Sequence, residues 1–561
     1  MTRRVVIVGG VACGAKTASR LMRVCADAQV TVLEKGDWVS YAGCGLPYYV
    51  GGVVSEYRQL AGTALGVMRD AAYFRGVKGV EVLTRHMATR IDRANRILRA
   101  TDLNTGEERT FPYDALVLAT GASPIRPPIP GVDSGRVYTL WTMPDALAMR
   151  DAVDSGTVRN AVIVGAGLVG MEMVESLVNR GIRVSVVDAL ATPLPAVFDG
   201  EFGLRLKKCM ERHDVEFHGG EKVLEIECEG GTAKSVRTDA RTLPSDMVLL
   251  SVGVRPNTAL AKDAGLELGA RGAIVVDERM RTSDPYIYAG GDCAETVNFL
   301  TGKRVWQPMG STANRQGRVI ADAIAGLPAM FRGVQGTGIL KFFELTAGKT
   351  GLTDAEVLEA GLDPVAVTVV GGDIPHFMPG AGSLTMRLSC ERKSRRVLGL
   401  QLLGNGRGDK RLDAAVNAIA SGMTVDDLAD ADLAYAPPFS TALDMLTHAA
   451  NALRNKLDGL MPSYSATELA AKFERGETSL LLDVRTAPEL DAQGRLPYDS
   501  VHIPLGQLRN RAGELPKDRE IVTFCKVSIR GWDALCILRH LGFERVAVLE
   551  GGVMGWPYSL R

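Results

Sequence analysis

The sequence predicts an α/β protein that is divided into several domains. Two short apolar strands, at residues 4–8 and 161–164, each run into a glycine-rich turn and then into a helical stretch. Near the C-terminus, from about residue 478, short strands again alternate with helical stretches. Strands that alternate with helices form parallel sheets, and 561 residues are too many for a single core. We therefore expect three or four domains, most of them built on parallel sheets.

The first glycine turn has the order of parts that a dinucleotide requires. The strand RVVIV leads into Gly9 and Gly10, a helix follows from Gly14, and the next strand ends in Glu34. Such a unit supplies a tight turn, a helix N-terminus for the pyrophosphate and a carboxylate for a ribose hydroxyl. Val11 stands where the G-x-G-x-x-G pattern has its middle glycine, so this turn alone is a weak signal.

The second glycine turn carries the full pattern. The strand AVIV leads into Gly165, Gly167 and Gly170, and the following strand, RVSVVD, ends in Asp188. A carboxylate at this position accepts a hydrogen bond from the adenosine 2′-hydroxyl and repels a 2′-phosphate, so NADH is favoured over NADPH. Two turns of this kind, each with strand, helix and acid in order, indicate two dinucleotide sites rather than two ordinary connections.

Two later strands carry further motifs that are typical of a known family. Residues 116–124 read LVLATGASP and residues 286–295 read YIYAGGDCAE. With these segments, residues 1 to about 450 resemble the pyridine nucleotide–disulfide oxidoreductases, flavoproteins with two Rossmann-like dinucleotide-binding domains. The resemblance implies that FAD is held by Gly9, Gly10, Gly14, Glu34, Thr120, Gly121, Gly291 and Asp292. It implies that NADH is held by Gly165, Gly167, Gly170 and Asp188.

A single cysteine, Cys44, lies in the stretch SYAGCGLPYY at residues 40–49. It is either a small buried residue or a nucleophile whose thiolate is stabilised by a helix N-terminus. The resemblance favours the second interpretation, because the family places a redox-active cysteine here, beside the flavin. The fifth residue after it is Tyr49, so the C-x-x-x-x-C disulfide of the glutathione-reductase-like branch is absent.

Two one-cysteine branches of the family remain. NADH oxidases and peroxidases cycle the thiol through sulfenic acid and usually carry a histidine where this chain has VACGAK. Coenzyme A-disulfide reductases form a mixed disulfide with coenzyme A. The stretch SYAGCGLPYYVGG resembles the second branch, although Gly43 replaces its common asparagine.

A second segment supports the coenzyme A branch. The stretch YAPPFST resembles a segment by which its reductases contribute a tyrosine across the dimer interface, here Tyr435. An ordinary turn tyrosine before a Pro-Pro stretch is the alternative. The other tyrosine of that branch, in a YPGA-like segment, is missing, since residues 376–381 read HFMPGA.

Cations for the phosphates of coenzyme A are expected on the helix after the first glycine turn. The resemblance points to Arg20 and Arg23, and a solvated helix face is the alternative. Cys13, at the start of this helix, is interpreted as a packing residue. The remaining cysteines show no metal-ligand spacing, so no metal site is expected; they are Cys25, Cys209, Cys228, Cys293, Cys390 and Cys536.

The last hundred residues resemble a rhodanese. The motifs that carry this resemblance are Asp483-Val484-Arg485, His502-Ile503-Pro504, the loop from Cys525 to Arg530, and Gly551-Gly552 with Trp556. A cysteine that ends a strand faces a ring of backbone N–H groups, which stabilises its thiolate. The resemblance implies that Cys525 accepts sulfane sulfur, with Arg530 in its loop. An inactive module with a buried cysteine is the alternative, and Ser528 replaces a glycine that is common in this loop.

Composition limits the partners. Lysine plus arginine and aspartate plus glutamate number 65 each, so no overall field attracts nucleic acid. No apolar run approaches the length of a membrane span, no signal peptide is evident, and the nine cysteines are scattered. We expect a cytoplasmic protein that binds no nucleic acid and no membrane.

These observations lead to one functional hypothesis. The chain is expected to be a homodimeric, FAD-dependent and NADH-linked reductase of coenzyme A disulfide, coenzyme A persulfide or polysulfide. Cys44 would form the mixed disulfide and Cys525 would transfer sulfane sulfur. The alternatives are an NADH oxidase or peroxidase that uses a Cys44 sulfenic acid, and a sulfur carrier that delivers persulfide sulfur from Cys525. The expected domains are 1–115 with 245–325 (FAD), 116–244 (NADH), 326–450 (α+β dimerisation) and 463–561 (rhodanese).

Overall fold

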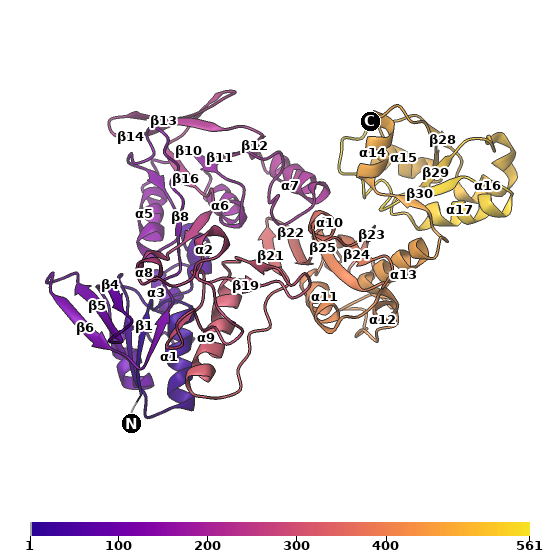
Figure 1. Ribbon diagram of the computed structural model, residues 1–561. Coiled ribbons are helices and arrows are strands. Elements are labelled where there is room, and N and C mark those ends of the chain that lie inside the picture. Colours follow the sequence, from indigo (N-terminus) through magenta and orange to yellow (C-terminus); the bar gives the residue numbers. More distant parts are fainter. Residues whose placement is uncertain (1–2) are drawn as a thin grey trace. The chain divides into compact units, whose positions relative to one another are not determined.

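The computed structural model describes residues 3–561, which divide into two compact units (Figure 1). The first unit comprises the residues up to Ala191 and Glu211–Val334, and the second comprises Thr192–Met210 and Gln335–Arg561. Across the described residues, no helix has both the length and the apolar character that a membrane crossing requires.

The first unit contains a parallel five-stranded sheet that includes the N-terminal strand. The four apolar residues Val5–Val8 are buried, as expected for a strand that is covered on both faces. The order in the sheet is β18 (Ile287–Ala289), β7 (Ala115–Leu118), β1 (Arg4–Val8), β2 (Gln29–Leu33) and β3 (Glu81–Leu83). The helices that pack here include α1 (Cys13–Val24) and α9 (Gly310–Ile324), which contact each other.

A second parallel sheet in the same unit repeats this plan. Its order is β12 (Glu216–Gly219), β11 (Arg183–Asp188), β10 (Asn160–Val164), β16 (Met247–Leu250) and β9 (Val137–Tyr138). Helix α6 (Leu168–Val178) follows β10, and α5 (Met143–Asp154) precedes it.

Smaller elements complete the first unit. The antiparallel strands are β4 (His86–Asp92), β5 (Ile97–Asp102) and β6 (Glu108–Pro112); β13 (Val223–Glu229), β14 (Thr232–Thr238) and β15 (Thr242–Pro244); β8 (Ala122–Pro124) with β17 (Val254–Pro256); and β19 (Thr296–Val297) with β20 (Arg304–Val305). The short helices are α2 (Leu46–Val50), α3 (Tyr57–Ala61), α4 (Ala71–Tyr73) and α8 (Ala259–Asp263).

The second unit begins with an antiparallel sheet, as predicted for the dimerisation region. Its order is β21 (Gly338–Phe342), β22 (Leu345–Gly351), β25 (Val397–Gly404), β24 (Ser383–Glu391) and β23 (Pro364–Gly372). All eight residues of β25 are buried. The helices of this region are α7 (Gly200–Arg212), α10 (Asp354–Glu359), α11 (Asp409–Ser421), α12 (Val425–Ala429) and α13 (Met445–Leu457).

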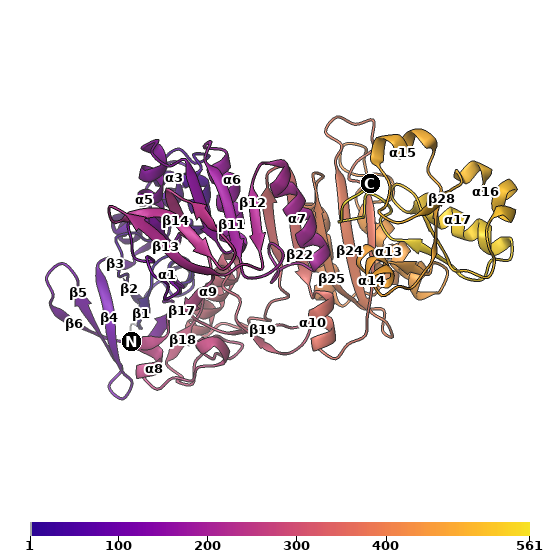
Figure 2. The same cartoon turned by 90° about the horizontal axis from the view of Figure 1, so that it is seen from above.

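The C-terminal part of the second unit is a parallel sheet flanked by helices (Figures 1 and 2). Its order is β26 (Ser463–Tyr464), β30 (Val546–Leu549), β29 (Ile521–Phe524), β27 (Leu480–Asp483) and β28 (Ser500–His502). The helices are α14 (Ala466–Glu474), α15 (Ala487–Gln493), α16 (Leu505–Arg511) and α17 (Ile529–His540).

The sheets assign two short strands differently from the expected domain ranges. Strand β16, which follows residue 245, belongs to the second sheet, and β7, which lies mostly after residue 115, belongs to the first. Each is a strand through which the chain crosses from one domain to the other. Sequence patterns locate such a strand but do not reveal its neighbours.

Candidate active sites at two cysteines

The first glycine turn is packed so tightly that its glycines are required. Gly9 has a φ of 103°, and a Cβ there would lie 2.1 Å from the carbonyl oxygen of Ala119. A Cβ on Gly14 would lie 1.8 Å from the oxygen of Gly9. The carboxylate of Glu34 accepts hydrogen bonds from the N–H groups of Gly10 and Gly36, both at 2.8 Å. This is a rigid cradle at the N-terminus of α1 that suits a pyrophosphate and its ribose.

The second glycine turn has the same construction. Gly165 has a φ of 102°, and a Cβ there would lie 2.3 Å from the oxygen of Ser251. The carboxylate of Asp188 accepts hydrogen bonds from Ala166 N–H at 2.7 Å and Leu190 N–H at 2.8 Å. Both predicted ribose-binding acids are therefore fixed by backbone amides, and each carboxylate oxygen has a further lone pair for a ligand.

The other predicted flavin residues gather at the carboxyl ends of β7 and β18. The hydroxyl of Thr120 donates to the carbonyl of Asn257 at 2.6 Å, and the Asn257 side chain donates back at 2.9 Å. The N–H of Gly291 donates to buried Gln316 at 2.7 Å. Burial raises the pKa of Asp292 to about 6. Asn257 and Gln316 lack a sequence motif, so the sequence did not single them out.

Cys44 lies in a short 3-10 turn, Gly43–Gly45, immediately before α2. Its side chain is exposed, and its Sγ would be 3.6 Å from a Cβ built on Gly310, the first residue of α9. A cysteine beside a helix N-terminus meets N–H groups that favour its thiolate. The turn is held by its neighbour, since Ala42 N–H donates to the carbonyl of Leu60 at 2.9 Å.

Two carboxyl groups oppose ionisation of Cys44. Desolvation by the surrounding protein raises the pKa of its thiol, and the charges of Glu172 and Asp292 raise it further. Burial raises the pKa of Glu172 itself to about 7. Glu172 lies on α6, one helical turn before Ser176, which packs against Gly51 at the end of α2. Nothing in the sequence indicated that Glu172 would lie close to the cysteine.

A cavity of about 340 Å³ is lined by residues of α3 and of segments 37–39 and 68–70. The ring centroids of Trp38 and Tyr57, two of its lining residues, are 5.2 Å apart in an edge-to-face arrangement. Arg58 and Arg69 also line it. Asp37 and Asp70 line it as well, so its walls combine aromatic surface with charged groups of both signs.

The two predicted phosphate-binding arginines differ in their surroundings. The Nε of Arg20 donates to Asp322 of α9 at 2.7 Å, so one edge of its guanidinium is occupied. Arg23 is exposed in the last turn of α1. The pair with Asp322 joins residues 302 positions apart, which sequence spacing does not reveal.

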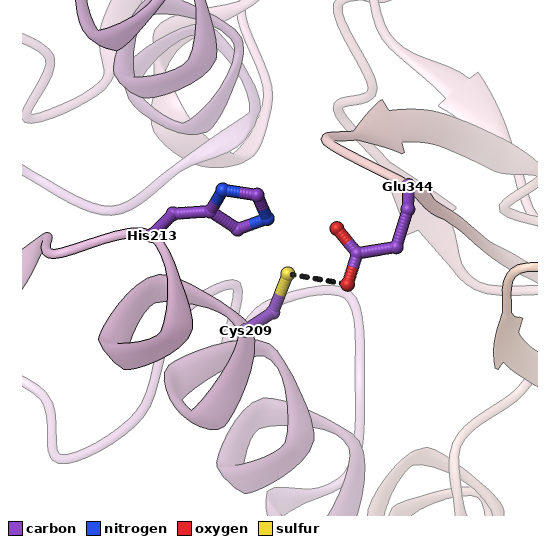
Figure 3. A group of neighbouring side chains, drawn as sticks. All are labelled: Cys209, His213 and Glu344. Carbon is purple, nitrogen blue, oxygen red and sulfur yellow. Dashed lines mark hydrogen bonds between the residues drawn. The ribbon is translucent and has the colours of Figure 1, made fainter.

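The structure buries Cys13 and Cys209, two thiols for which no chemical role is expected. Cys13 lies against Gly290, whose Cβ would be 2.9 Å from its Sγ, and burial raises the pKa of this thiol. Cys209, on α7, is buried and donates to the carboxylate of Glu344 at 3.8 Å (Figure 3).

Tyr435 lies on an exposed loop of the dimerisation region. Its side chain is 54% exposed, and nearby Phe439 is 60% exposed. The loop is anchored by Arg411, which is buried and pairs with Asp444 at 2.8 Å. Arg411 also donates to the carbonyl of Asp373 at 2.6 Å, so one arginine fixes this loop and the loop that carries the HFMPGA stretch.

Cys525 directly follows β29 and is buried. The loop after it includes Ser528, which has a φ of 86° although it is not a glycine, and α17 then begins at Ile529. Arg530 forms a two-pronged ion pair with Glu489, at 2.8 and 2.6 Å, which holds the pKa of Glu489 at about 2. The loop therefore ends at the N-terminus of α17, where the ion pair with Glu489 fixes the position of Arg530.

The other C-terminal motifs act as internal supports. Arg485 is fully buried and pairs with Asp483 at 2.7 Å. The Nε2 of His502 is 2.8 Å from the carbonyl oxygen of Arg485, to which it donates. Trp556 is buried in the core of this domain. These residues support the carboxyl end of the parallel sheet, where Cys525 lies.

Comparison with known proteins agrees with this geometry. Residues 3–317 match the family described as pyridine nucleotide-disulphide oxidoreductase, residues 338–447 match its dimerisation domain, and residues 465–557 match the rhodanese-like domain. An NAD(P)H sulfur oxidoreductase (CoA-dependent) of Pyrococcus furiosus is 35% identical over 453 residues, which are 81% of this chain and 99% of that protein.

Two solved structures resemble nearly the whole chain. A NAD-dependent persulfide reductase from A. fulgidus is 41% identical with a TM-score of 0.93, covering 99% of this chain and 100% of that one. Reduced Bacillus anthracis CoADR-RHD is 35% identical with a TM-score of 0.93, covering 99% and 98%. The predicted fold class is confirmed, and the chain belongs to the pyridine nucleotide-disulphide oxidoreductase family, with a rhodanese-like domain at its C-terminus.

Proposed function

We propose that this protein is an NADH-linked, FAD-dependent reductase of coenzyme A persulfide, polysulfide or coenzyme A disulfide. The observation that carries the proposal is the presence of two separate thiol sites in one chain. Cys44 lies near Asp292 and the N-terminus of α9, and Cys525 lies in the loop between β29 and α17. Relatives named as CoA-dependent sulfur and persulfide reductases support this substrate class.

The chemistry at Cys44 begins with its thiolate. The thiolate attacks the inner sulfur of coenzyme A persulfide, a Cys44–S–S–coenzyme A bond forms, and hydrosulfide leaves. With coenzyme A disulfide, the leaving group is a coenzyme A thiolate. Reduction of this mixed disulfide by two electrons and one proton then regenerates the Cys44 thiolate and releases coenzyme A thiol. When bound, FAD supplies those electrons from NADH.

The surrounding residues have defined tasks in this scheme. The N-terminus of α9 favours the attacking thiolate, and the nearby carboxyl of Glu172 is poised to exchange a proton near neutral pH. Arg23, which is exposed on α1, and the remaining edge of the Arg20 guanidinium provide cations for coenzyme A phosphates. Asp188 favours NADH over NADPH.

At Cys525 the proposed reaction is sulfur transfer. The thiolate takes the terminal sulfur of a donor such as polysulfide, which leaves a persulfide on Cys525 and a shortened donor. The persulfide sulfur then passes to the coenzyme A thiolate and regenerates Cys525. The flexible arm of coenzyme A would raise the effective concentration of sulfur at Cys44.

We propose a homodimer as the functional unit. The match to a dimerisation domain supports it, as do the exposed apolar side chains Phe377, Phe439 and Leu443 in the same region of the chain. Tyr435 would then act at Cys44 of the second copy, where its hydroxyl protonates a leaving thiolate.

Two variants test the proposal. Cys44→Ser should abolish NADH oxidation by both coenzyme A disulfide and polysulfide while FAD remains bound. Cys525→Ser should spare the disulfide reaction and impair the polysulfide reaction. Reductase activity that survives in Cys44→Ser would exclude the assignment, and polysulfide turnover unchanged in Cys525→Ser would exclude the relay. Consumption of oxygen or peroxide without any disulfide acceptor would instead support an oxidase.

A further inference from the structure

A buried carboxylate joins the rhodanese-like domain to the dimerisation region. Glu550 directly follows β30 and is 2% exposed. One of its oxygens accepts hydrogen bonds from the ammonium group of Lys456 at 2.6 Å and from the hydroxyl of Ser463 at 2.7 Å. The other oxygen accepts the N–H of Thr368 at 2.8 Å. Since Lys456 lies in the last turn of α13 and Thr368 lies in β23, this carboxylate binds two elements of the neighbouring region.

The residues that follow Glu550 support the Cys525 loop. A Cβ on Gly552 would lie 2.3 Å from the carbonyl oxygen of Cys525, so the two backbones are in direct contact. Val553 N–H donates to that same oxygen at 3.0 Å, and Met554 N–H donates to the carbonyl of Lys526 at 3.0 Å. A displacement of Glu550 would therefore be transmitted to the cysteine.

The residue before Glu550 contacts the same loop. The hydroxyl of Ser528 donates to the carbonyl of Leu549 at 3.2 Å. Residues 549–555 thus form a segment that supports the Cys525 loop. The C-terminal end of this segment is fixed as well, because Arg205 of α7 donates to the carbonyl of Met554 at 3.2 Å and also to that of Gly555. Segment 549–555 is thus held from one side by the dimerisation sheet and α7, and it holds the Cys525 loop on its other side.

We propose that Glu550 and Lys456 are positioning residues for sulfur transfer at Cys525. Neither touches the reacting sulfur. Their ion pair, which is buried at its Glu550 end, sets the position of segment 549–555 and, through it, the backbone N–H groups around the Cys525 thiolate. The dimerisation region is thereby part of the support of the sulfur-transfer site. This inference rests on the proposed function of Cys525.

The chain offers a matched control pair inside the rhodanese-like domain. Lys472 pairs with Glu520, and the hydroxyl of Ser479 also donates to Glu520. This repeats the lysine, glutamate and serine arrangement at Glu550. Glu520 precedes β29, whereas Cys525 follows it, so the control pair lies at the opposite end of the strand.

The experiment compares Lys456→Met, Lys456→Arg and Lys472→Met in the full-length protein. The first readout is the pH dependence of Cys525 alkylation by iodoacetamide, followed peptide by peptide with mass spectrometry. The second is kcat and KM for sulfur transfer from thiosulfate to cyanide. Lys456→Met should lower kcat about tenfold, with a smaller change in KM, and shift the alkylation profile. Lys456→Arg should restore both. Lys472→Met should leave both within about twofold, even if it lowers the unfolding temperature equally.

The outcomes separate the two proposals. Equal effects of Lys456→Met and Lys472→Met on Cys525, or an unchanged alkylation profile in Lys456→Met, would overturn the positioning role. If Lys456→Met does not fold, Glu550→Gln breaks the same ion pair from its carboxylate side with little change in volume, and the displaced loop should shift the profile in the same direction. If the wild-type protein transfers no sulfur from thiosulfate or polysulfide, the proposed function of Cys525 fails, while the alkylation comparison still decides the positioning role.

Discussion

At the scale of single residues, the protonation of Cys44 depends on the groups around it. Desolvation and the charges of Glu172 and Asp292 raise the pKa of its thiol, whereas the N-terminus of α9 acts in the opposite direction. Glu172 has a pKa of about 7 because it is buried. The Glu172 carboxyl therefore ionises as the pH rises through about 7, and its negative charge then destabilises the Cys44 thiolate.

Glu172→Gln should lower the pKa of Cys44. The substitution removes a negative charge that otherwise opposes the thiolate above about pH 7, and a shift of about half a unit to one unit is expected. The rate of Cys44 alkylation against pH measures it. Glu175→Gln is the control, because Glu175 lies on the same helix but is not among the groups that raise the pKa of Cys44. A profile that moves equally in both variants would contradict a specific role for Glu172.

Ser528→Gly should be better tolerated than Ser528→Ala in the rhodanese-like domain. Ser528 has a φ of 86° and a ψ of −31°, a conformation that costs a residue with a Cβ about 1–3 kcal/mol. Both variants lose the hydrogen bond from the Ser528 hydroxyl to Leu549, but only glycine removes the strain, and greater freedom of the unfolded chain offsets about 0.4–1 kcal/mol of that gain. Denaturant unfolding should therefore find Ser528→Gly more stable than Ser528→Ala by about 1 kcal/mol. Ser528→Ala keeps the strain and loses the hydrogen bond to Leu549, so it should destabilise; the opposite order of the two variants would exclude a strained serine.

At the scale of elements, the Tyr435 loop depends on the N-terminus of α13. Asp444 caps this helix by accepting the N–H of Leu446, and it also pairs with Arg411 and accepts the hydroxyl of Ser440. These contacts hold the pKa of Asp444 below its usual range even though burial opposes them. One buried cluster therefore starts the helix and ends the loop.

Arg411→Met should be strongly destabilising. Arg411 and Asp444 have side-chain exposures of 1% and 2%, and removal of one partner of such a pair costs about 3–5 kcal/mol. Arg454→Met is the control, because its partner Asp430 is 78% exposed and such pairs contribute about 0–1 kcal/mol. Denaturant unfolding compares the two variants. A loss of less than about 1 kcal/mol in Arg411→Met would show that the cluster does not hold the loop.

The same scale explains what the sequence could predict. The glycine turns and their acids, Glu34 and Asp188, are local patterns, and the structure places each acid on the N–H groups of its own turn. The pair of Arg20 with Asp322 joins two helices that are far apart in the sequence, so the spacing of residues along one helix could not predict it. The approach of Glu172 to Cys44 likewise depends on how α6 packs against α2.

At the scale of the whole molecule, the order of domains was predictable because each carries its own motif. The family matches follow that order along the chain, from the dinucleotide-binding region to the rhodanese-like domain. The support of the Cys525 loop by Lys456 could not be predicted, since it joins residues of two domains that have separate sequence signatures.

The central claim is that Cys44 exchanges electrons with a sulfur–sulfur bond through a mixed disulfide. Mass spectrometry of the protein after treatment with coenzyme A disulfide, in the absence of NADH, tests it directly. We predict one coenzyme A adduct, on the peptide that contains Cys44, which NADH then removes. An adduct confined to other cysteines, or a Cys44 that carries only sulfenic acid and never coenzyme A, would contradict the account.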